Sequence, residues 1–169
     1  ADNICGGSSR FHGSQGSSVL KLFGLTAAST GINEKAAQTA GIAYDKVVLF
    51  PASHATYYPG AQSMAMKVLY EKESLRLLGA QIVGSDGVDK RIDVLATAIR
   101  AKMTALELTE LDLSYAPPYS SAKDPVNMAG FMIDNIAKGT LKQWHLEDMD
   151  KISKDKDVVL LDVRTVGEF

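Results

Sequence analysis

The stretch Met64-Ala65-Met66-Lys67-Val68-Leu69-Tyr70-Glu71 decides the fold class of this chain. Every second residue falls on the same side of the backbone, and that side collects the larger apolar side chains, Met64, Met66, Val68 and Tyr70. A period of two predicts a half-buried β-strand. A second strand is predicted over residues 75–84, and the short turn between the two makes them a hairpin.

Further elements are predicted on both sides of this hairpin. Before it, residues 18–30 indicate one extended run, residues 33–40 a short helix capped by Asn33, and residues 46–50 a buried strand. After it, a helix is predicted over residues 88–103, with its apolar residues on one face. We expect four charged residues of that helix to lie in solvent, namely Lys90, Arg91, Asp93 and Arg100.

The last long helix has clear signals at both ends. Asp124 is a predicted cap, Pro125 suits the first helical position, and Gly139 ends the helix. Its predicted apolar face packs on the core and consists of Met128, Phe131, Met132 and Ile136. Strands followed by helices favour an α+β fold, in which an antiparallel sheet carries helices packed on one face.

Composition argues against several classes of function. The 169 residues suffice for one compact domain plus an appendage. The net charge of −2 gives no basic surface for nucleic acid, and no apolar run approaches the roughly 20 residues that span a membrane. The single cysteine, Cys5, permits no internal disulfide, which is compatible with the cytoplasm. His145 has no second histidine or cysteine at ligand spacing, so no metal site is predicted.

Two loops combine tyrosine, proline and polar residues, one over residues 54–60 and one over residues 115–125. Proline fixes φ and stiffens such a loop. A stiff loop can hold a phenol in one place, which suits a tyrosine that donates a proton or a hydrogen bond. The alternative is that these tyrosines pack on the core.

The two loops also carry a resemblance to a known family. The run His54-Ala55-Thr56-Tyr57-Tyr58-Pro59-Gly60 and residues 64–68 resemble the start of the C-terminal dimerisation domain of FAD-dependent pyridine nucleotide-disulfide oxidoreductases. Residues 112–121, which include Tyr115-Ala116-Pro117-Pro118-Tyr119, and residues 124–130 resemble its end. The chain is most similar to the coenzyme A-disulfide reductase branch, with NADH oxidases, NADH peroxidases and polysulfide reductases as relatives. The resemblance covers about residues 1–138, including a leader from the FAD domain.

A second resemblance lies at the C-terminal end. Residues 158–164 and the pair Glu168-Phe169 resemble the opening of a rhodanese domain, and four aliphatic residues in a row suit a buried strand. We therefore expect a linker over residues 139–156, with a short helix within residues 144–150, and the first strand of a truncated rhodanese-like domain over residues 157–169. The alternative is a last strand of the first domain.

The resemblance implies a larger flavoenzyme of which this sequence is a fragment. No Gly-x-Gly-x-x-Gly dinucleotide fingerprint is found in the sequence. In the family, FAD, NAD(P)H and the redox cysteine belong to the N-terminal part, so we expect the fragment alone to bind no cofactor and to be inactive. The resemblance leaves open whether NADH or NADPH is used, and it implies a homodimer.

The resemblance also suggests which residues take part in the active site. The dimerisation domain completes the active site of the partner subunit, and in this branch tyrosines replace the usual histidine. Tyr119 is the first candidate, and its partner is Tyr57 or Tyr58, with Tyr57 favoured. His54 is a second acid–base candidate, and the alternative for it is a structural role, because a histidine in a loop next to a strand is more often structural. Their role would be to protonate or hydrogen-bond the thiolate that leaves coenzyme A disulfide, or a related persulfide or polysulfide. The alternatives are an NADH oxidase or peroxidase, and a purely structural dimerisation module.

Overall fold

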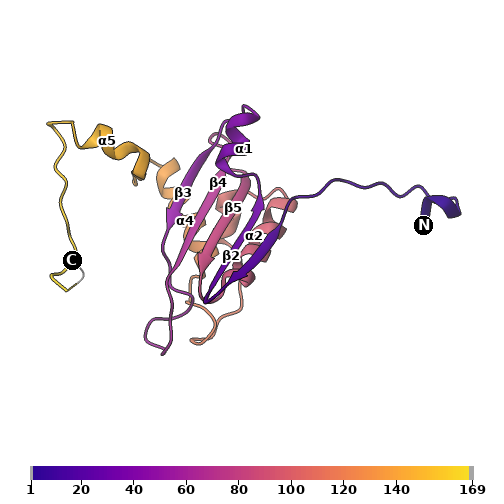
Figure 1. Cartoon of the computed structure of the whole chain (residues 1–169), viewed down its shortest axis with the longest axis horizontal. Helices are drawn as coiled ribbons and strands as arrows, with labels where there is room; N and C mark the ends of the chain where they lie inside the picture. The colour runs from indigo at the N-terminus through magenta and orange to yellow at the C-terminus, as the bar shows by residue number, and fades with distance from the viewer. Residues whose placement is uncertain (1, 168–169) are drawn as a thin grey trace.

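The computed structural model describes residues 2–167 of the chain. Within them, one antiparallel sheet runs in the order β1-β2-β5-β4-β3 (Figure 1). Its strands are β1 (Ser18–Leu22), β2 (Leu25–Gly31), β3 (Asp45–Leu49), β4 (Met64–Tyr70) and β5 (Leu77–Gly84). The predicted hairpin is confirmed as β4 and β5 at the centre of the sheet, where Val68 pairs with Ala80.

Two long helices, α2 (Val88–Arg100) and α4 (Pro125–Ala137), pack on one face of this sheet (Figure 1). The shorter helical elements are η1 (Asp2–Cys5), α1 (Glu34–Thr39), α3 (Ala105–Thr109), η2 (Leu146–Asp148) and α5 (Met149–Ile152). α2 packs on β2 and β5, and α3 packs against α4. The predicted α+β class, with an antiparallel sheet and helices on one face, is confirmed.

The hydrophobic core fills the space between the sheet and these helices. Met66, Val68 and Ile82 project from the sheet, and Leu95 and Ile133 meet them from α2 and α4. All five are buried. The apolar side of the period-two pattern therefore faces the helices, as the alternation predicts.

The extended run predicted over residues 18–30 is wrong in one respect, because it is a hairpin of two strands. Ser18 pairs with Ser29, and the chain reverses at Phe23 and Gly24. Phe23 adopts a φ of 51°, which bulky residues rarely do. No common turn residue except Gly24 marks the reversal, so the sequence pattern does not reveal it.

The buried face of α4 also differs from the prediction. Asp124 caps the helix and Pro125 begins it as expected, but the fully buried side chains are Val126, Ala129 and Ile133. Met128 and Met132 are only partly buried, and they line a pocket. Gly130 is one reason why this face of α4 is buried. A Cβ there would lie 2.7 Å from the Ala105 carbonyl oxygen, so glycine lets α4 lie directly against α3.

Both ends of the chain extend away from the sheet in Figure 1. Cys5 lies exposed in η1, and the short helix expected in the linker is found as η2 and α5. Residues 158–163 form no strand, and Glu168-Phe169 lies outside the described residues. The rhodanese resemblance and the predicted domain boundaries thus stay predictions. Within residues 2–167, no helix is long and apolar enough to cross a membrane.

Candidate functional site

The two tyrosine loops lie at the same end of the sheet. One joins β3 to β4 over residues 50–63, and the other joins α3 to α4 over residues 110–124. In Figure 1 both extend beyond the lower end of the strands. The backbone N–H of Ala55 donates to the carbonyl oxygen of Ser120 at 3.1 Å, so the loops are joined directly. Residues 65 positions apart in the sequence thus meet, and the two loops form one surface.

Two phenols meet at the tips of these loops. The Oη atoms of Tyr57 and Tyr115 are 2.9 Å apart, which is hydrogen-bonding distance. The Tyr57 side chain is 75% exposed, and Tyr115 is also exposed. The hydrogen bond with Tyr115 raises the pKa of Tyr57, with a smaller contribution from burial. Tyr57 therefore keeps its proton at neutral pH, and the pair can offer a hydrogen bond to a molecule in solvent.

Tyr119 and Tyr58, the other predicted tyrosines, lie outside this pair. Tyr119 is 70% exposed, and its contacts in the described structure come from its backbone, whose carbonyl oxygen accepts from Arg91 at 3.3 Å. Tyr58 stands edge-on to the His54 ring, with centroids 5.8 Å apart. The structure thus brings Tyr57 together with Tyr115, and the predicted role of Tyr119 with Tyr57 or Tyr58 stays a prediction.

His54 is buried beneath the first loop rather than displayed on it. Its Nδ1 lies 3.1 Å from the carbonyl oxygen of Ala55, and its ring packs against Tyr58. A buried ring held on both sides orients the loop, but it offers little access to a substrate. This placement favours the structural role over the acid–base role for His54.

Arg91 lies directly under the two loops, which corrects the prediction that it lies in solvent. Its side chain is about 2% exposed and is one of the largest buried side chains. One guanidinium nitrogen, Nη2, donates to the carbonyl oxygen of Ser53 at 2.7 Å and lies 2.9 Å from Oδ2 of Asp124. Helical periodicity places Arg91 beside the apolar stripe, and only the folded loops supply its partners.

Asp124 balances the buried charge of Arg91. Its carboxylate also accepts from the Ser120 hydroxyl at 2.8 Å and from the backbone N–H of Val126 at 3.0 Å, where it caps α4. Its own backbone N–H donates to the Asn127 side chain at 2.9 Å. Buried charges persist when they are paired and hydrogen-bonded in this way. The buried polar cluster of Arg91, Ser120, Asp124 and Asn127 therefore joins α2, the second loop and α4.

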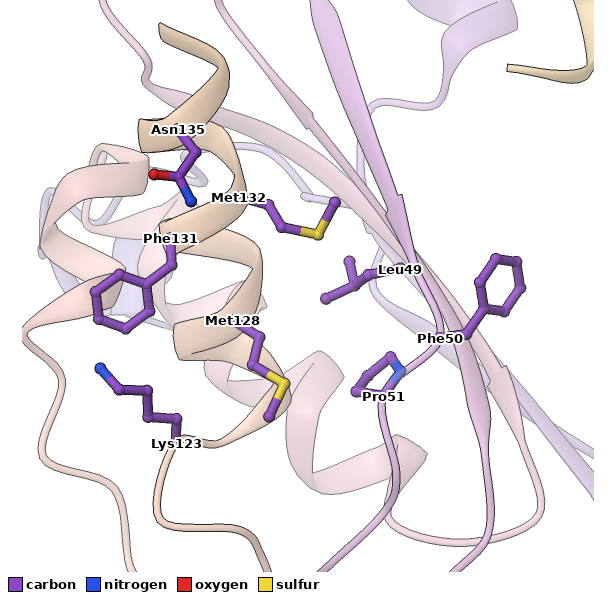
Figure 2. A pocket seen from close by; sticks show the side chains of 8 residues that line it. All are labelled: Leu49, Phe50, Pro51, Lys123, Met128, Phe131, Met132 and Asn135. Carbon is purple, nitrogen blue, oxygen red and sulfur yellow. The ribbon is translucent and has the colours of Figure 1, made fainter. Parts of the chain in front are cut away.

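A pocket of about 590 Å³ lies beside the second loop, between α4 and the end of β3 (Figure 2). Figure 2 shows Met128 and Met132 pointing across it toward Leu49, while Phe50 points to the other side of the strand. At its rim, Lys123 Nζ lies 3.7 Å from the centroid of the Phe131 ring, a cation–π contact. Flexible thioethers fill irregular gaps, so the methionines give this pocket an adaptable apolar wall.

The described structure contains no constellation for a metal ion. Within residues 2–167, no group of three or more histidine, cysteine, aspartate or glutamate side chains is placed to hold one. The tyrosine loops present phenols, which can donate and accept hydrogen bonds.

Comparison with known families assigns the fold. Residues 18–126 match the family described as pyridine nucleotide-disulphide oxidoreductase, dimerisation domain. The chain belongs to this family. The matched residues of the dimerisation domain include all strands of the sheet and both tyrosine loops. The family resemblance found in the sequence is thus confirmed for this part of the chain.

Individual relatives narrow the comparison. A coenzyme A disulfide reductase of Staphylococcus epidermidis is 42% identical over 132 residues, which are 78% of this chain and 30% of the relative. The crystal structure of reduced Bacillus anthracis CoADR-RHD matches with a TM-score of 0.86 and 47% identity, over 90% of this chain and 28% of that one. An NAD-dependent persulfide reductase from A. fulgidus matches with a TM-score of 0.82 and 44% identity, over 87% and 28%. The chain spans about 30% of the length of the curated relatives that it matches.

The sequence does not reveal that Tyr115 meets Tyr57 or that Arg91 is buried, and the reason is the same for both residues. Tyr115 and Tyr119 stand in one loop four residues apart, and nothing in their spacing tells which phenol faces the first loop. Arg91 is one of five charged residues in α2, and its burial depends on partners 33 and 38 residues away along the chain. The positions of both side chains depend on contacts that form only in the tertiary structure.

Proposed function

We propose that this chain is the dimerisation domain of a cytoplasmic, homodimeric, FAD- and NAD(P)H-dependent reductase of coenzyme A disulfide or a related persulfide or polysulfide. Its tyrosine loops would complete the active site of the partner subunit. The observation that carries this proposal is the 2.9 Å contact between the exposed Tyr57 and Tyr115 hydroxyls. Support for the substrate class comes from relatives named for coenzyme A disulfide and persulfide at 42% and 44% identity.

The proposed role of the pair is to stabilise a leaving thiolate. FAD and NAD(P)H, bound by other parts of the protein, would supply the electrons. Within the pair one phenol donates to the other, so one hydroxyl hydrogen is left to point outward. An ordinary thiol has a pKa of about 8.5 and a phenol about 10. Because the pKa of Tyr57 is raised further, the proton would stay on the phenol, and the pair would act by hydrogen bonding to the thiolate.

The test uses the protein extended to include its flavin and nicotinamide domains. NAD(P)H oxidation is followed with coenzyme A disulfide, with polysulfide and with oxygen alone. Replacing Tyr57 or Tyr115 by Phe keeps the ring and removes the hydroxyl, and loss of a hydrogen bond to a charged thiolate should lower kcat about 10- to 100-fold with a sulfur substrate. The matched controls are Tyr119→Phe and Tyr58→Phe, which should have smaller effects.

Each other outcome has a definite meaning. A large loss with Tyr119→Phe and none with Tyr57→Phe would move the role to the tyrosine favoured by the sequence. Turnover with oxygen alone, insensitive to all four changes, would indicate an NADH oxidase with a structural domain. The 169-residue chain by itself should not oxidise NADH, and any flavin-independent turnover by it would contradict the proposal.

The proposal includes a rhodanese-like domain that begins within residues 157–169. Its support is the aliphatic run over residues 158–161 followed by Asp162 and Arg164. Asp162 accepts from the Arg164 guanidinium at 2.6 Å, so the two side chains already form a local pair. A longer protein that lacks sulfur-transfer activity and shows no second folded unit by limited proteolysis would refute this part.

A further inference from the structure

We propose that Arg91 is the positioning residue that holds the two tyrosine loops at the separation at which Tyr57 and Tyr115 meet. This inference rests on the proposed role of the tyrosine pair. Arg91 belongs to neither loop, but its guanidinium binds the backbone of both. It donates to the carbonyl oxygen of Ser53 at 2.7 Å and to that of Tyr119 at 3.3 Å.

The positions of these two contacts are what make Arg91 suited to this task. Ser53 lies four residues before Tyr57, and Tyr119 lies four residues after Tyr115. Ser53 also lies at the base of the first loop, where the two ends of the loop are joined: its N–H donates to the Gln62 carbonyl oxygen at 2.7 Å. A shift of the guanidinium would therefore move one loop relative to the other and separate the two hydroxyls.

Only arginine offers the required set of donors. Its Nη1 donates to the Gly87 carbonyl oxygen at 3.1 Å, its Nε to Asp124 at 3.1 Å, and its Nη2 to the loops. A planar guanidinium presents five N–H groups in a fixed fork, whereas a lysine ammonium is a point charge on a flexible stem. The conservative change Arg91→Lys keeps the charge beside Asp124 and removes the simultaneous grip on both loops.

Gly87 shows how closely the guanidinium is enclosed. A Cβ at Gly87 would lie 2.1 Å from Nη1 of Arg91, too close for any side chain. Gly87 has a φ of 67° and precedes the first residue of α2. The substitution Gly87→Ala therefore displaces the guanidinium without altering an ionisable group.

The experiment follows each tyrosine of the 169-residue chain by NMR, using isotope-labelled ring carbons assigned with single Tyr→Phe variants. In Arg91→Lys, the pKa of Tyr57 should fall toward the ordinary value of about 10, and the signals of Tyr57 and Tyr115 should shift together. The signal of Tyr70, which is buried in the core, should not move. Arg100→Lys is the matched control, because Arg100 is exposed at the end of the same helix.

A second pair of variants keeps the inference testable if Arg91→Lys does not fold. Gly87→Ala and Gly41→Ala place alanine at similar φ values of 67° and 64°, but a Cβ at Gly41 meets nothing within 4 Å. Only Gly87→Ala should alter the Tyr57 and Tyr115 signals. Unchanged signals in both Arg91→Lys and Gly87→Ala would overturn the inference, as would equal changes at Tyr70, which would indicate a general loosening of the fold.

The same spectra separate this inference from the proposed function, because they need no substrate. If Tyr57→Phe leaves turnover of the extended protein intact while Arg91→Lys alters the pair, the proposed function fails and the positioning role stands. If both act on turnover, a double-mutant cycle should show that the losses are not additive. Additive losses would indicate that Arg91 acts elsewhere.

Discussion

The chain contains two clusters of opposite charges that use similar chemistry in different surroundings. Arg91 and Asp124 form a buried pair beneath the tyrosine loops, each about 2% exposed. Glu34 binds Lys46 and Lys67 on the sheet face opposite α2 and α4, where 12–32% of each side chain is exposed. The buried pair must keep all its partners, because water cannot replace them. The partly buried cluster around Glu34 is reached by water, so water can replace some of its contacts and screens its charges.

The largest expected effect would come from leaving Arg91 without its counter-charge. Asp124→Asn retains a residue that can cap α4 but leaves the arginine buried and unpaired, which should destabilise the fold by about 3–5 kcal/mol. The measurement is the free energy of unfolding by urea. The matched variant in the partly buried cluster is Glu34→Gln, which weakens two ion pairs and should cost about 1–2 kcal/mol after screening by solvent. Equal losses of unfolding free energy in the two variants would contradict the idea that the buried pair depends more strongly on its partners.

Asn127 extends the comparison to a neutral member of the buried cluster. Its side-chain nitrogen donates to the carbonyl oxygens of Leu108 and Leu111 at 2.8 and 3.0 Å, which ties the end of α3 to α4. Asn127→Ala leaves these acceptors buried without a donor and should cost about 1–3 kcal/mol. A urea midpoint unchanged from wild type would show that water reaches these carbonyls.

The sequence predicted those features whose causes are local. The alternation over residues 64–71 gave β4, and Asp124 with Pro125 gave the start of α4, because neighbouring residues alone decide both. The reversal at Phe23 and the burial of Arg91 were missed. A positive φ at a bulky residue and a charge enclosed by distant loops depend on tertiary contacts that no short window of sequence contains.

The candidate site divides in the same way. Both tyrosine loops were found from their composition and from the family resemblance, and Tyr57 was among the named candidates. Which phenol stands opposite Tyr57 depends on how the second loop turns between Ala116 and Ser120. Tyr115 follows Ser114 and Tyr119 precedes Ser120, with two prolines between them, so composition alone does not tell which phenol meets Tyr57.

A smaller, pH-dependent effect on the free energy of unfolding should appear in the partly buried cluster around Glu34. Burial alone would raise the pKa of Glu34, but hydrogen bonds and charge attraction from Lys46 and Lys67 outweigh it and lower the pKa from 4.5 to about 2. The stabilisation is therefore present above about pH 4.5 and is lost as the pH falls toward 2. The difference in unfolding free energy between wild type and Glu34→Gln should shrink over that range. A difference that is constant with pH would contradict this assignment.

The smallest effect on stability is expected where the linker meets the sheet. The Gln143 side chain accepts from the N–H of Val48 at 3.0 Å and donates to its carbonyl oxygen at 2.5 Å. Gln143→Ala should change the unfolding free energy of the domain by less than about 0.5 kcal/mol. Because the released linker is more accessible, limited proteolysis within residues 139–148 should become faster. Lys142→Ala is the control on the neighbouring residue, and cleavage equally fast in both variants would contradict the anchoring role of Gln143.

The contact between Gln143 and Val48 also bears on how molecules of this chain can polymerise. Val48 lies in β3, the last strand of the sheet, and an open strand edge is a template for a strand of another molecule. The amide of one side chain occupies the N–H and the carbonyl that a foreign strand would need, and the N–H of Lys46 on the same strand bonds to the Asp45 carboxylate. With the β3 edge blocked, β1 is the other edge at which a strand could add. Two molecules that paired through their β1 strands would have no free edge left, so growth would stop at two molecules instead of continuing into a fibril.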